Sequence, residues 1–401
     1  MSVTIAQNWI TIPSGTTDQL NDIDFPSNNV GYAVGNNYNF LKTIDGGKTW
    51  TKSIPAGLVF MGTNNFTKVQ FINDSIGFVM LENRGIYKTI DGGLNFTAEM
   101  MQGALCFPHD MFFFDEDNGY AAGGQCFAGE SVDKKDAGMW GWSTTLNIQA
   151  QNMLHTISFR NTNLGLTAGT EGTFFRTNDA GISWDSVFTL STGDSISSIS
   201  WANDTLVYAA TTNNLSLFYS GDAGLTWQQE TNSATFFYPK MRTTSTNSNG
   251  YFVSGGYAAQ AAQGLIYERK PWNTGWQWKN ISANHAINGS TTFADSIAFV
   301  VGDSGLIMTN LDTSSIGSSL IKIDVPTISV YPNPVNDHFN IECQEKNVNI
   351  TIYNIAGQSV LKEDYEVLTS VAVGKLPVGI YQILISKNSS AIGIARFVKT
   401  N

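Results

Sequence analysis

The sequence has few charged residues, few cysteines and few prolines. Of its 401 residues only 14% are Asp, Glu, Lys or Arg, and it holds 3 Cys and 10 Pro. Long helices need Ala, Leu, Glu and Lys. Gly, Asn, Ser, Thr and aromatic residues abound here instead, which favours short strands joined by tight turns. No apolar run is long enough to cross a membrane as a helix. The length allows two or three domains.

Positive charge is also scarce. Lys and Arg number 22 against 33 Asp and Glu, which gives a net charge of −11. Residues 329–401 contain six acidic and six basic residues, so the whole excess lies on the first 328 residues. A surface this acidic repels phosphate groups. That excludes nucleic acid as a partner and disfavours anionic membranes and polyanionic glycans.

The sequence signatures of common catalytic and cofactor sites are absent. There is no nucleophile elbow, no phosphate-binding loop and no zinc-ligand spacing. The acidic run Asp115-Glu116-Asp117 lacks the ligand spacing of a calcium loop and fits a solvated turn. We therefore expect no cofactor and no metal site.

A short motif occurs four times. Each copy reads Ser/Thr-x-Asp-x-Gly-x, followed by a small polar residue and then Trp or Phe. The copies are Thr43–Trp50, Thr89–Phe96, Thr177–Trp184 and Ser220–Trp227. The pattern resembles the Asp-box, and four copies of so specific a pattern exclude coincidence.

The chemistry of this motif is structural. We expect each aspartate to accept hydrogen bonds from backbone N–H groups of its own turn, and the glycine to supply the turn conformation. The aromatic residue begins the next strand and packs between neighbouring sheets. The motif therefore pins a hairpin and is not catalytic. The residues in question are Asp45, Asp91, Asp179, Asp222, Trp50, Trp184 and Trp227.

A second element, an apolar strand flanked by small residues, repeats seven times. Its copies start at Gly31, Gly77, Gly119, Gly165, Val207, Gly250 and Ala298. With an alternating strand before it and a motif copy or a degraded one after it, each unit has four short strands over about 43 to 50 residues. That is the size of a propeller blade.

The last unit lacks the fourth strand that begins with Trp, and a spare strand, Trp9–Pro13, stands at the N-terminus. We expect this strand to complete the last blade, which closes the ring and removes an exposed edge. The prediction is an all-β fold with a seven-bladed propeller of four-stranded blades over residues 7–320. Residues 1–6 read either as a signal-peptide remnant or as an ordinary N-terminus.

The repeat resembles the photosystem II stability/assembly factor-like propellers. Their Gly-Tyr-Ala-Val-Gly and Lys-Thr-x-Asp-Gly-Gly-x-Thr-Trp signatures stand here at residues 31–35 and 42–50, and the resemblance covers roughly residues 8–320. Sialidases share the Asp-box but match less well. The propeller also has too few arginines for the triad that a sialidase needs.

After a linker at residues 321–328, a different set of motifs follows. It consists of Tyr331, Pro332, Asn333 and Pro334, then Gly357, Gly379, Tyr381 and Lys399. Their succession over residues 329–401 resembles the type A sorting domain of the type IX secretion system of Bacteroidetes-like bacteria, a small Ig-like β-sandwich. The resemblance implies recognition by the type IX secretion machinery and a secreted or outer-membrane-surface location.

Candidate binding residues share one face of the expected propeller. Loops between strands two and three of a blade, and loops between blades, emerge on one face, whereas the Asp-boxes lie on the other. His109 and His155 begin the first strands of adjacent blades and should meet at the channel mouth, and His285 enters the last blade on that face. Phe127 and Tyr257 lie in long loops there and could stack on a sugar. The alternative is that these residues only solvate the mouth and pack the loops.

The cysteines belong to the same face. Cys106 lies in the loop that enters blade three, and Cys126 lies in the loop between strands two and three of that blade. We therefore predict a Cys106–Cys126 disulfide, which leaves Cys343 unpaired.

Taken together, the sequence favours a monomeric, secreted or cell-surface propeller that binds a glycan or a protein without catalysis. The alternative is a divergent extracellular glycoside hydrolase, which needs two carboxylates about 5 to 10 Å apart. Glu82, Glu171 and Asp110 are the candidates on the binding face, and nothing in the sequence pairs them.

Overall fold

The computed structural model contains two compact units, Met1–Leu311 and Asp312–Asn401. No helix in its described part is long and apolar enough to cross a membrane. The residues that the structure describes are 9–58, 65–82, 85–100, 107–124, 129–135, 141–148, 152–189, 195–212, 217–229, 240–246, 252–258, 263–269, 277–280, 285–293, 297–311, 330–341, 346–354, 359–367, 370–387 and 390–400.

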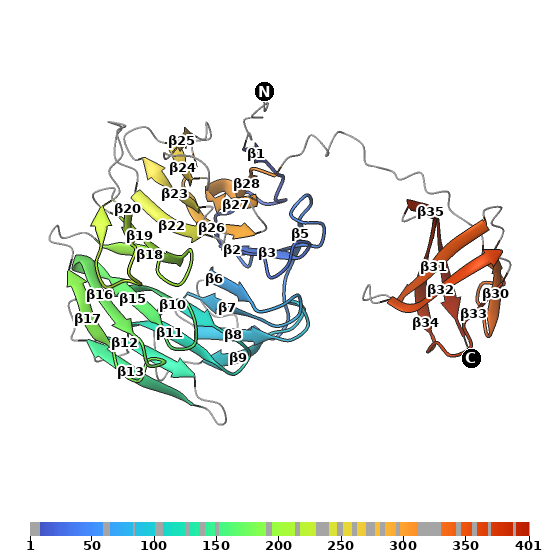
Figure 1. Ribbon diagram of the computed structural model, residues 1–401, viewed down its shortest axis with the longest axis horizontal. Helices are drawn as coiled ribbons and strands as arrows, with labels where there is room; N and C mark the ends of the chain where they lie inside the picture. Colours follow the sequence, from blue (N-terminus) through green and yellow to red (C-terminus); the bar gives the residue numbers. More distant parts are fainter. Residues whose placement is uncertain are drawn as a thin grey trace. The chain divides into compact units, whose positions relative to one another are not determined.

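The first unit consists of seven antiparallel four-stranded sheets, the blades of a propeller (Figure 1). Six blades follow chain order from their first to their fourth strand, and the seventh takes its fourth strand from the N-terminus. The seven first strands contact one another in a closed circle. This arrangement confirms the predicted all-β propeller.

The strands of blades one to three are β2 (Leu20–Asp24), β3 (Gly31–Gly35), β4 (Phe40–Thr43), β5 (Thr51–Ser53), β6 (Phe66–Phe71), β7 (Gly77–Leu81), β8 (Gly85–Thr89), β9 (Thr97–Met100), β10 (Phe107–Phe113), β11 (Gly119–Gly124), β12 (Glu130–Lys135) and β13 (Trp142–Ile148). Those of blades four and five are β14 (Leu154–Phe159), β15 (Gly165–Gly169), β16 (Thr173–Thr177), β17 (Asp185–Thr189), β18 (Ile196–Trp201), β19 (Val207–Thr211), β20 (Leu217–Ser220) and β21 (Gln228–Gln229). Those of blades six and seven are β22 (Lys240–Thr246), β23 (Phe252–Ala258), β24 (Gln263–Arg269), β25 (Gln277–Asn280), β26 (Ile287–Phe293), β27 (Ile297–Gly302), β28 (Ile307–Thr309) and β1 (Ile10–Thr11). Two 3₁₀ turns, η1 (Thr170–Gly172) and η2 (Asp303–Gly305), link second to third strands.

The ring closes through the N-terminal strand, as the sequence predicts. Strand β1 pairs antiparallel with β28, with Ile10 opposite Thr309 and Thr11 opposite Met308. The side chain of Trp9 packs against the apolar cluster that contains Ile287. The last blade is therefore built from both ends of the propeller chain, which leaves no open edge between the first and last blades.

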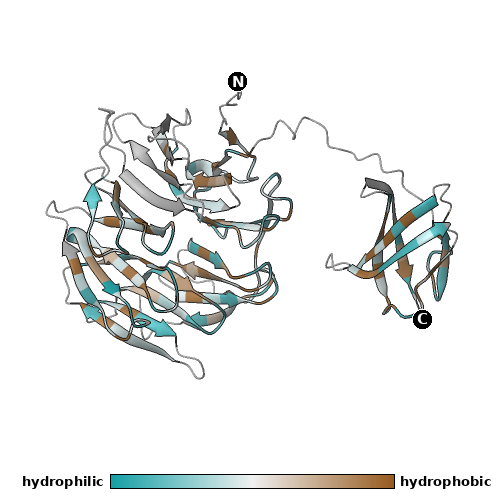
Figure 2. Ribbon diagram, in the orientation of Figure 1, coloured by the Kyte–Doolittle hydropathy of each residue, from teal (hydrophilic) through white to brown (hydrophobic). Residues whose placement is uncertain are grey.

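Second strands form much of the described core of the propeller. All five residues of β3, β7, β15 and β19 are buried, and Figure 2 shows hydrophobic segments along the blades. The glycine that opens β3, β7 and β15 lies under an aromatic ring at the end of the first strand. A Cβ on Gly31 would lie 2.5 Å from the Phe25 ring, and one on Gly77 would lie 2.4 Å from the Phe71 ring. Only glycine fits at this close approach.

The four repeated turns link third to fourth strands. Asp45 Oδ1 accepts the backbone N–H groups of Lys48 and Thr49 at 3.0 and 2.9 Å, and the Gly47 N–H donates to Thr43 Oγ1 at 3.0 Å. Equivalent bonds form at Asp91, Asp179 and Asp222. In the last two turns the hydroxyls of Ser183 and Thr226 lower the pKa of the aspartate to about 2. These carboxylates are occupied by their own turns.

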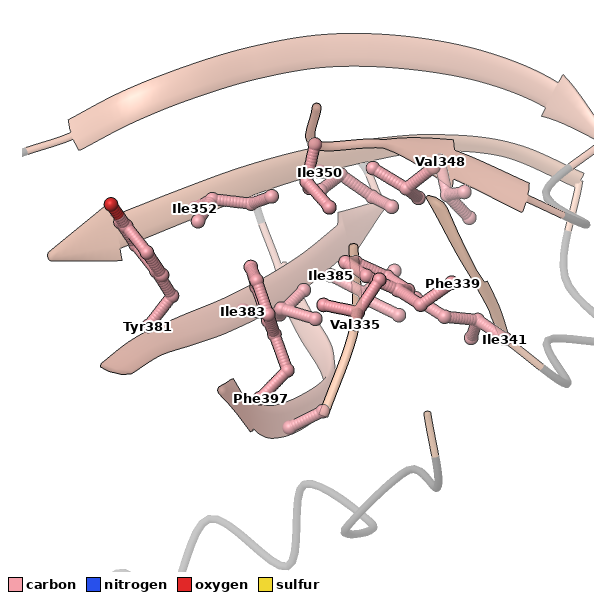
Figure 3. Close-up of a cluster of buried hydrophobic side chains, with 13 residues drawn as sticks. Val335, Phe339, Ile341, Val348, Ile350, Ile352, Tyr381, Ile383, Ile385 and Phe397 are labelled. Carbon is pink, nitrogen blue, oxygen red and sulfur yellow. The ribbon is translucent and has the colours of Figure 1, made fainter. Parts of the chain in front are cut away.

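The second unit has two antiparallel sheets, ordered β29-β30-β33 and β32-β31-β34-β35. Phe339, Ile352, Ile385 and Phe397 lie in its single core (Figure 3). Two sheets over one core fit the predicted small sandwich, whereas its Ig-like topology stays a prediction. The strands are β29 (Val330–Tyr331), β30 (His338–Ile341), β31 (Lys346–Asn354), β32 (Ser359–Val367), β33 (Ser370–Ala372), β34 (Gly379–Lys387) and β35 (Ser390–Lys399).

Candidate functional site

The first strand of every blade carries a β-bulge near its start, at the channel mouth. In each of the seven strand pairs the register shifts across one residue. A bulge turns the extra side chain away from the regular alternation and is common beside binding sites. The propeller thus carries one such position in each blade. These positions, called the bulge ring below, are Asn21, Thr67, His109, His155, Ser197, Arg242 and Asn288.

Members of the bulge ring tie neighbouring blades together. The Asn21 side-chain amide donates to the Phe66 carbonyl at 2.6 Å, and the Asn288 amide donates to the Leu20 carbonyl at 3.0 Å. His109 Nδ1 makes the same bond to the Leu154 carbonyl at 2.7 Å. In each case the acceptor stands just before the bulge of the next blade. The bond acts as a latch between blades.

Blade three holds the backbone of Leu154 from both sides. His109 Nδ1 bonds its carbonyl, and its N–H donates to Glu130 Oε2 at 3.1 Å. Because a carbonyl only accepts, Nδ1 must carry the proton. In the neutral imidazole of His109, Nε2 is then a hydrogen-bond acceptor. The fold thus fixes the tautomer of this histidine.

A pocket of about 820 Å³ opens over this part of the bulge ring, across blades two to five. Its volume lies in the range of small-ligand sites. The lining comes from first-strand starts and from the loops after second strands and between blades, so it belongs to the face opposite the repeated turns. The lining residues are Thr67, Met80, Glu82, Phe107, Pro108, His109, Gly124, Gly129, Glu130, Asn152, Met153, His155, Thr170, Ser197 and Thr212.

The structure brings His109 and His155 together in this pocket. Their ring centroids lie 5.8 Å apart with an angle of 37° between the planes. Burial lowers the pKa of His155, and the neighbouring His109 lowers it further. His155 is therefore neutral at pH 7, and the pair does not carry two positive charges.

Two carboxylates also line the pocket. Burial raises the pKa of Glu130, while the Leu154 N–H and His109 oppose this effect. Glu82 accepts a hydrogen bond from Asn65 Nδ2 at 2.8 Å. Each of the two uses one oxygen, Oε2, to hold a neighbouring segment in place.

The other carboxylates considered from the sequence lie elsewhere. Asp110 is buried in the channel wall, where it accepts the Ile157 N–H at 3.0 Å and forms an ion pair with Lys68 at 3.3 Å. Glu171 lies in η1 with a positive φ of 54°. Neither residue lines the pocket. Among the described residues no three His, Cys, Asp or Glu side chains form a group that could hold a metal ion.

Of the remaining candidates, the structure places the side chain of His285 alone. His285 lines another cavity, of about 730 Å³, with Thr17 and Ser304 at blade seven. Tyr257 stands in β23, and nothing is described of its side chain. Phe127, Cys106 and Cys126 lie outside the described residues, as does Cys343, so the predicted disulfide stays a prediction.

The motif residues of the second unit mainly join its strands. The Asn333 side chain donates to the Arg396 carbonyl at 3.0 Å and accepts the Val398 N–H at 2.9 Å. Tyr381 is buried against Phe397. The remaining motif residues differ in exposure and position. Tyr331 is exposed, Gly379 begins β34, Lys399 Nζ donates to the Thr400 carbonyl, and Gly357 lies outside the described residues. The peptide bonds before Pro332 and Pro334 are cis.

The bulge ring and the latches are what sequence reasoning missed. The available signal was a polar residue before each alternating strand, such as Asn21 and His109. The shift in register that makes these residues equivalent is set by pairing with the second strand, which the sequence pattern does not show.

Two family models match the sequence. Residues 1–97 match the model described as photosynthesis system II assembly factor YCF48, and residues 329–399 match that of the secretion system C-terminal sorting domain. No curated protein matches the sequence.

Solved propellers share the fold. YCF48 bound to D1 peptide has a TM-score of 0.57 at 15% identity, covering 75% of this chain and 96% of that one. YCF48 from Cyanidioschyzon merolae has the same TM-score and identity, covering 75% and 98%. The GH74 xyloglucanase from Xanthomonas campestris has a TM-score of 0.54 at 13% identity, and this chain spans only 53% of its length. These identities show similarity of fold alone.

The matches agree with the division of the chain into two units, and they confirm both resemblances. The chain therefore joins a propeller similar to YCF48 to a C-terminal sorting domain of the type IX secretion system, and it is a secreted or cell-surface protein.

Proposed function

We propose that the exported propeller is a non-catalytic binding protein that holds a glycan or protein ligand in the pocket over blades two to five. The observation that carries the proposal is the pocket of about 820 Å³, built on His109 and His155 of the bulge ring. Bulges fix these side chains on rigid strands, and loops from four blades supply the rim. Rigid placement of a few polar groups in a partly apolar hollow suits ligand binding.

The structural contacts of the carboxylates near the pocket argue against catalysis as the main role. Glu82 and Glu130 each hold a structural segment through one oxygen. Asp110 is committed to Ile157 and Lys68 within the channel wall. A glycosidase needs one free carboxylate as acid and another as nucleophile or base on opposite sides of the scissile bond.

One observation favours a second candidate, a divergent glycoside hydrolase. The raised pKa of Glu130 suits a general acid, and Glu82 lines the same pocket. Two GH74 enzymes share the propeller fold at 12% and 13% identity. If this function holds, polysaccharide hydrolysis occurs and Glu130→Gln abolishes it. A screen of xyloglucan, cellulose, mannan and chitin that releases no reducing sugar rules it out.

The binding proposal can be tested with the histidines as reporters. The chain has four, His109, His155, His285 and His338, and only the first two line the pocket. The full chain is screened on arrays of glycans and short peptides, and each hit is titrated while imidazole resonances are followed by NMR. We expect hits to shift the resonances of His109 and His155 and to leave His285 and His338 unchanged.

Substitution provides the second arm of this test. His109→Asn removes the imidazole from the pocket and leaves an amide that can make the latch bond, as Asn21 and Asn288 do. We expect this variant to stay folded and to bind each hit at least tenfold more weakly. Hits that shift only His285, or that bind the variant equally well, would falsify the assignment of the site.

A further inference from the structure

We propose that the pocket selects a positively charged group, namely a Lys or Arg side chain presented by an extended peptide segment of a partner protein. This inference rests on the proposed function and adds the chemical class of the ligand. Four features of the pocket support it: the signs of its charges, the direction of its hydrogen-bonding groups, its apolar rim and its size.

The lining carries negative charge without a fixed positive one. Glu82 and Glu130 line the pocket, and the described lining residues include no Lys or Arg. Lys68, on the first strand of blade two, is bound to Asp110 in the channel wall. The propeller unit, residues 1–311, holds 25 acidic and 15 basic residues, a net charge of −10. A cation entering the pocket therefore gains attraction at the site and over the whole surface.

The polar groups of the pocket mostly present lone pairs. With Nδ1 of His109 donating to Leu154, Nε2 is an acceptor in the neutral form of the ring. The hydroxyl of Thr67 donates to the carbonyl of Met80 at 3.4 Å, which leaves its oxygen to accept. A pocket of acceptors is satisfied by a ligand rich in donors. Ammonium and guanidinium groups have three and five N–H donors and no acceptor.

Both glutamates keep one oxygen for a ligand. Glu130 uses Oε2 for the Leu154 N–H, and Glu82 uses Oε2 for Asn65. Within the described part of the chain, the Oε1 atoms of the two residues have no hydrogen-bond partner. Charge-assisted bonds from a cation to these oxygens are stronger than bonds between neutral groups.

Apolar side chains at the rim match the stem of such a residue. Phe107 and Met153 are 47% and 49% exposed although both line the pocket. The aliphatic stem of Lys or Arg packs on such surfaces while its charged end reaches a polar site. The Phe107 ring can also face the cation itself. A small hydrophilic cation would leave this rim unused.

The pocket is larger than one side chain needs, which indicates a ligand longer than a single residue. About 820 Å³ is several times the volume of one Lys or Arg side chain, and the lining spans four blades. Acceptors spread over this area suit the N–H groups of an extended peptide. A peptide with a central basic residue therefore uses the glutamates, the rim and the acceptors together.

The test uses three acetylated and amidated peptides, Gly-Ser-Ala-Lys-Ala-Ser-Gly and its counterparts with Gln or Glu in place of Lys. Each is titrated into the full chain while the imidazole resonances of His109 and His155 are followed, with His285 and His338 as internal references. We expect the Lys peptide to bind at least tenfold more tightly than the Gln peptide, and the Glu peptide to cause no shift. Added salt should weaken the binding of the Lys peptide more than that of the Gln peptide.

Two double variants assign the effect to the pocket. Glu82→Gln with Glu130→Gln should reduce the preference for Lys over Gln to less than threefold. The control, Asp74→Asn with Asp117→Asn, removes the same charge from exposed turns at the opposite end of blades two and three. It should keep the preference.

The outcomes separate this inference from the proposed function. Equal binding of the Lys and Gln peptides, or loss of the preference in the control, overturns the choice of a cation and leaves the pocket a binding site. If a xyloglucan heptasaccharide shifts the resonances of His109 and His155 and no peptide does, the choice of a peptide ligand is overturned and the binding function stands. If neither the peptides nor any array hit shifts His109 or His155, both fail.

Discussion

His109 shows at the scale of one residue how structure and binding share a side chain. Its Nδ1 forms the latch to Leu154, and its ring lines the pocket. Asn21 and Asn288 make the same latch with an amide at the same bulge position. The latch therefore does not need an imidazole. The position of His109 in the pocket gives the imidazole a second role, in binding.

This equivalence predicts how the propeller responds to substitution. His109→Ala should lower the free energy of unfolding by about 1 kcal/mol, because a buried carbonyl loses its partner. His109→Asn should stay within roughly 0.5 kcal/mol of the wild type. Urea unfolding followed by tryptophan fluorescence measures both. An Asn variant as unstable as the Ala variant would show that the imidazole itself is needed for stability.

Asp133 is a buried carboxylate in the third strand of blade three, and its burial lowers the stability of the fold. It is fully buried, and neither carboxylate oxygen has a hydrogen-bond partner within the described part of the chain. It pairs with Ala121, as Leu41 pairs with Ala33 in blade one, so the repeat places an apolar residue at the equivalent position. Burial raises the pKa of Asp133, and the neighbouring Thr144 and Ser131 hydroxyls, too poorly aligned to satisfy its oxygens, only partly oppose this effect.

We expect Asp133→Leu to stabilise the propeller by about 2 kcal/mol at pH 7.5, because a buried unpaired carboxyl is removed. In the wild type, the free-energy cost of burying the ionised Asp133 carboxylate is present above the raised pKa of this group. That cost is lost as the carboxyl protonates at lower pH. The stabilisation by Asp133→Leu should therefore become smaller towards pH 4. Leu41→Asp, the reverse change in blade one, should destabilise. Thermal unfolding at both pH values compares the three chains, and an unaltered melting temperature for Asp133→Leu would contradict the account.

The first strands are the elements that join the blades. Along them carboxylates accept backbone N–H groups of the next blade, as Asp22 does from Val69 and Asp24 from Phe71. Burial raises the pKa of Asp22 to about 6 and that of Asp24 to about 7. These strands therefore hold carboxylates whose ionisation opposes folding.

The pH dependence of stability follows from the direction of this shift. The folded state binds a proton at Asp24 more tightly than the unfolded state, so stability rises as the pH falls from about 8 towards 4. Asp24→Asn keeps an oxygen for the Phe71 N–H and cannot ionise. It should stabilise by roughly 2 kcal/mol at pH 8 and by little at pH 4. Asp117→Asn, in an exposed turn, serves as the control. Equal effects of Asp24→Asn at both pH values would refute this reading.

Elements were more predictable from the sequence than the site. Each glycine-led second strand and the closing strand at Trp9 could be recognised, because every blade repeats one pattern of buried and turn residues. The neighbourhood of His109 and His155 also followed from topology. The bulges, the latch to Leu154 and the pocket role of Glu130 did not follow, since they depend on strand register and on contacts between blades.

At the scale of the whole molecule, the two units differ in charge and in aromatic content. Residues 1–311 hold 25 acidic and 15 basic residues, a net charge of −10, whereas residues 312–401 hold 8 acidic and 7 basic residues, a net charge of −1. All 10 Trp residues precede Asp312, so tryptophan fluorescence reports on the propeller alone. Each unit has its own core, and the division falls at Leu311. The propeller can therefore be examined separately from the domain that exports it.

This division leads to a prediction about export. A chain that ends at Leu311 keeps all four strands of every blade, including the β1–β28 pair. We expect its tryptophan-monitored urea midpoint to match that of the full chain. In a host with a type IX system, it should accumulate in the periplasm instead of the medium, as immunoblots of both fractions would show. Residues 312–401 fused to a periplasmic reporter should carry the reporter outside. Export of the truncated chain would mean that the sorting signal also lies in the propeller. A lowered urea midpoint would mean that the propeller depends on the second unit for its stability.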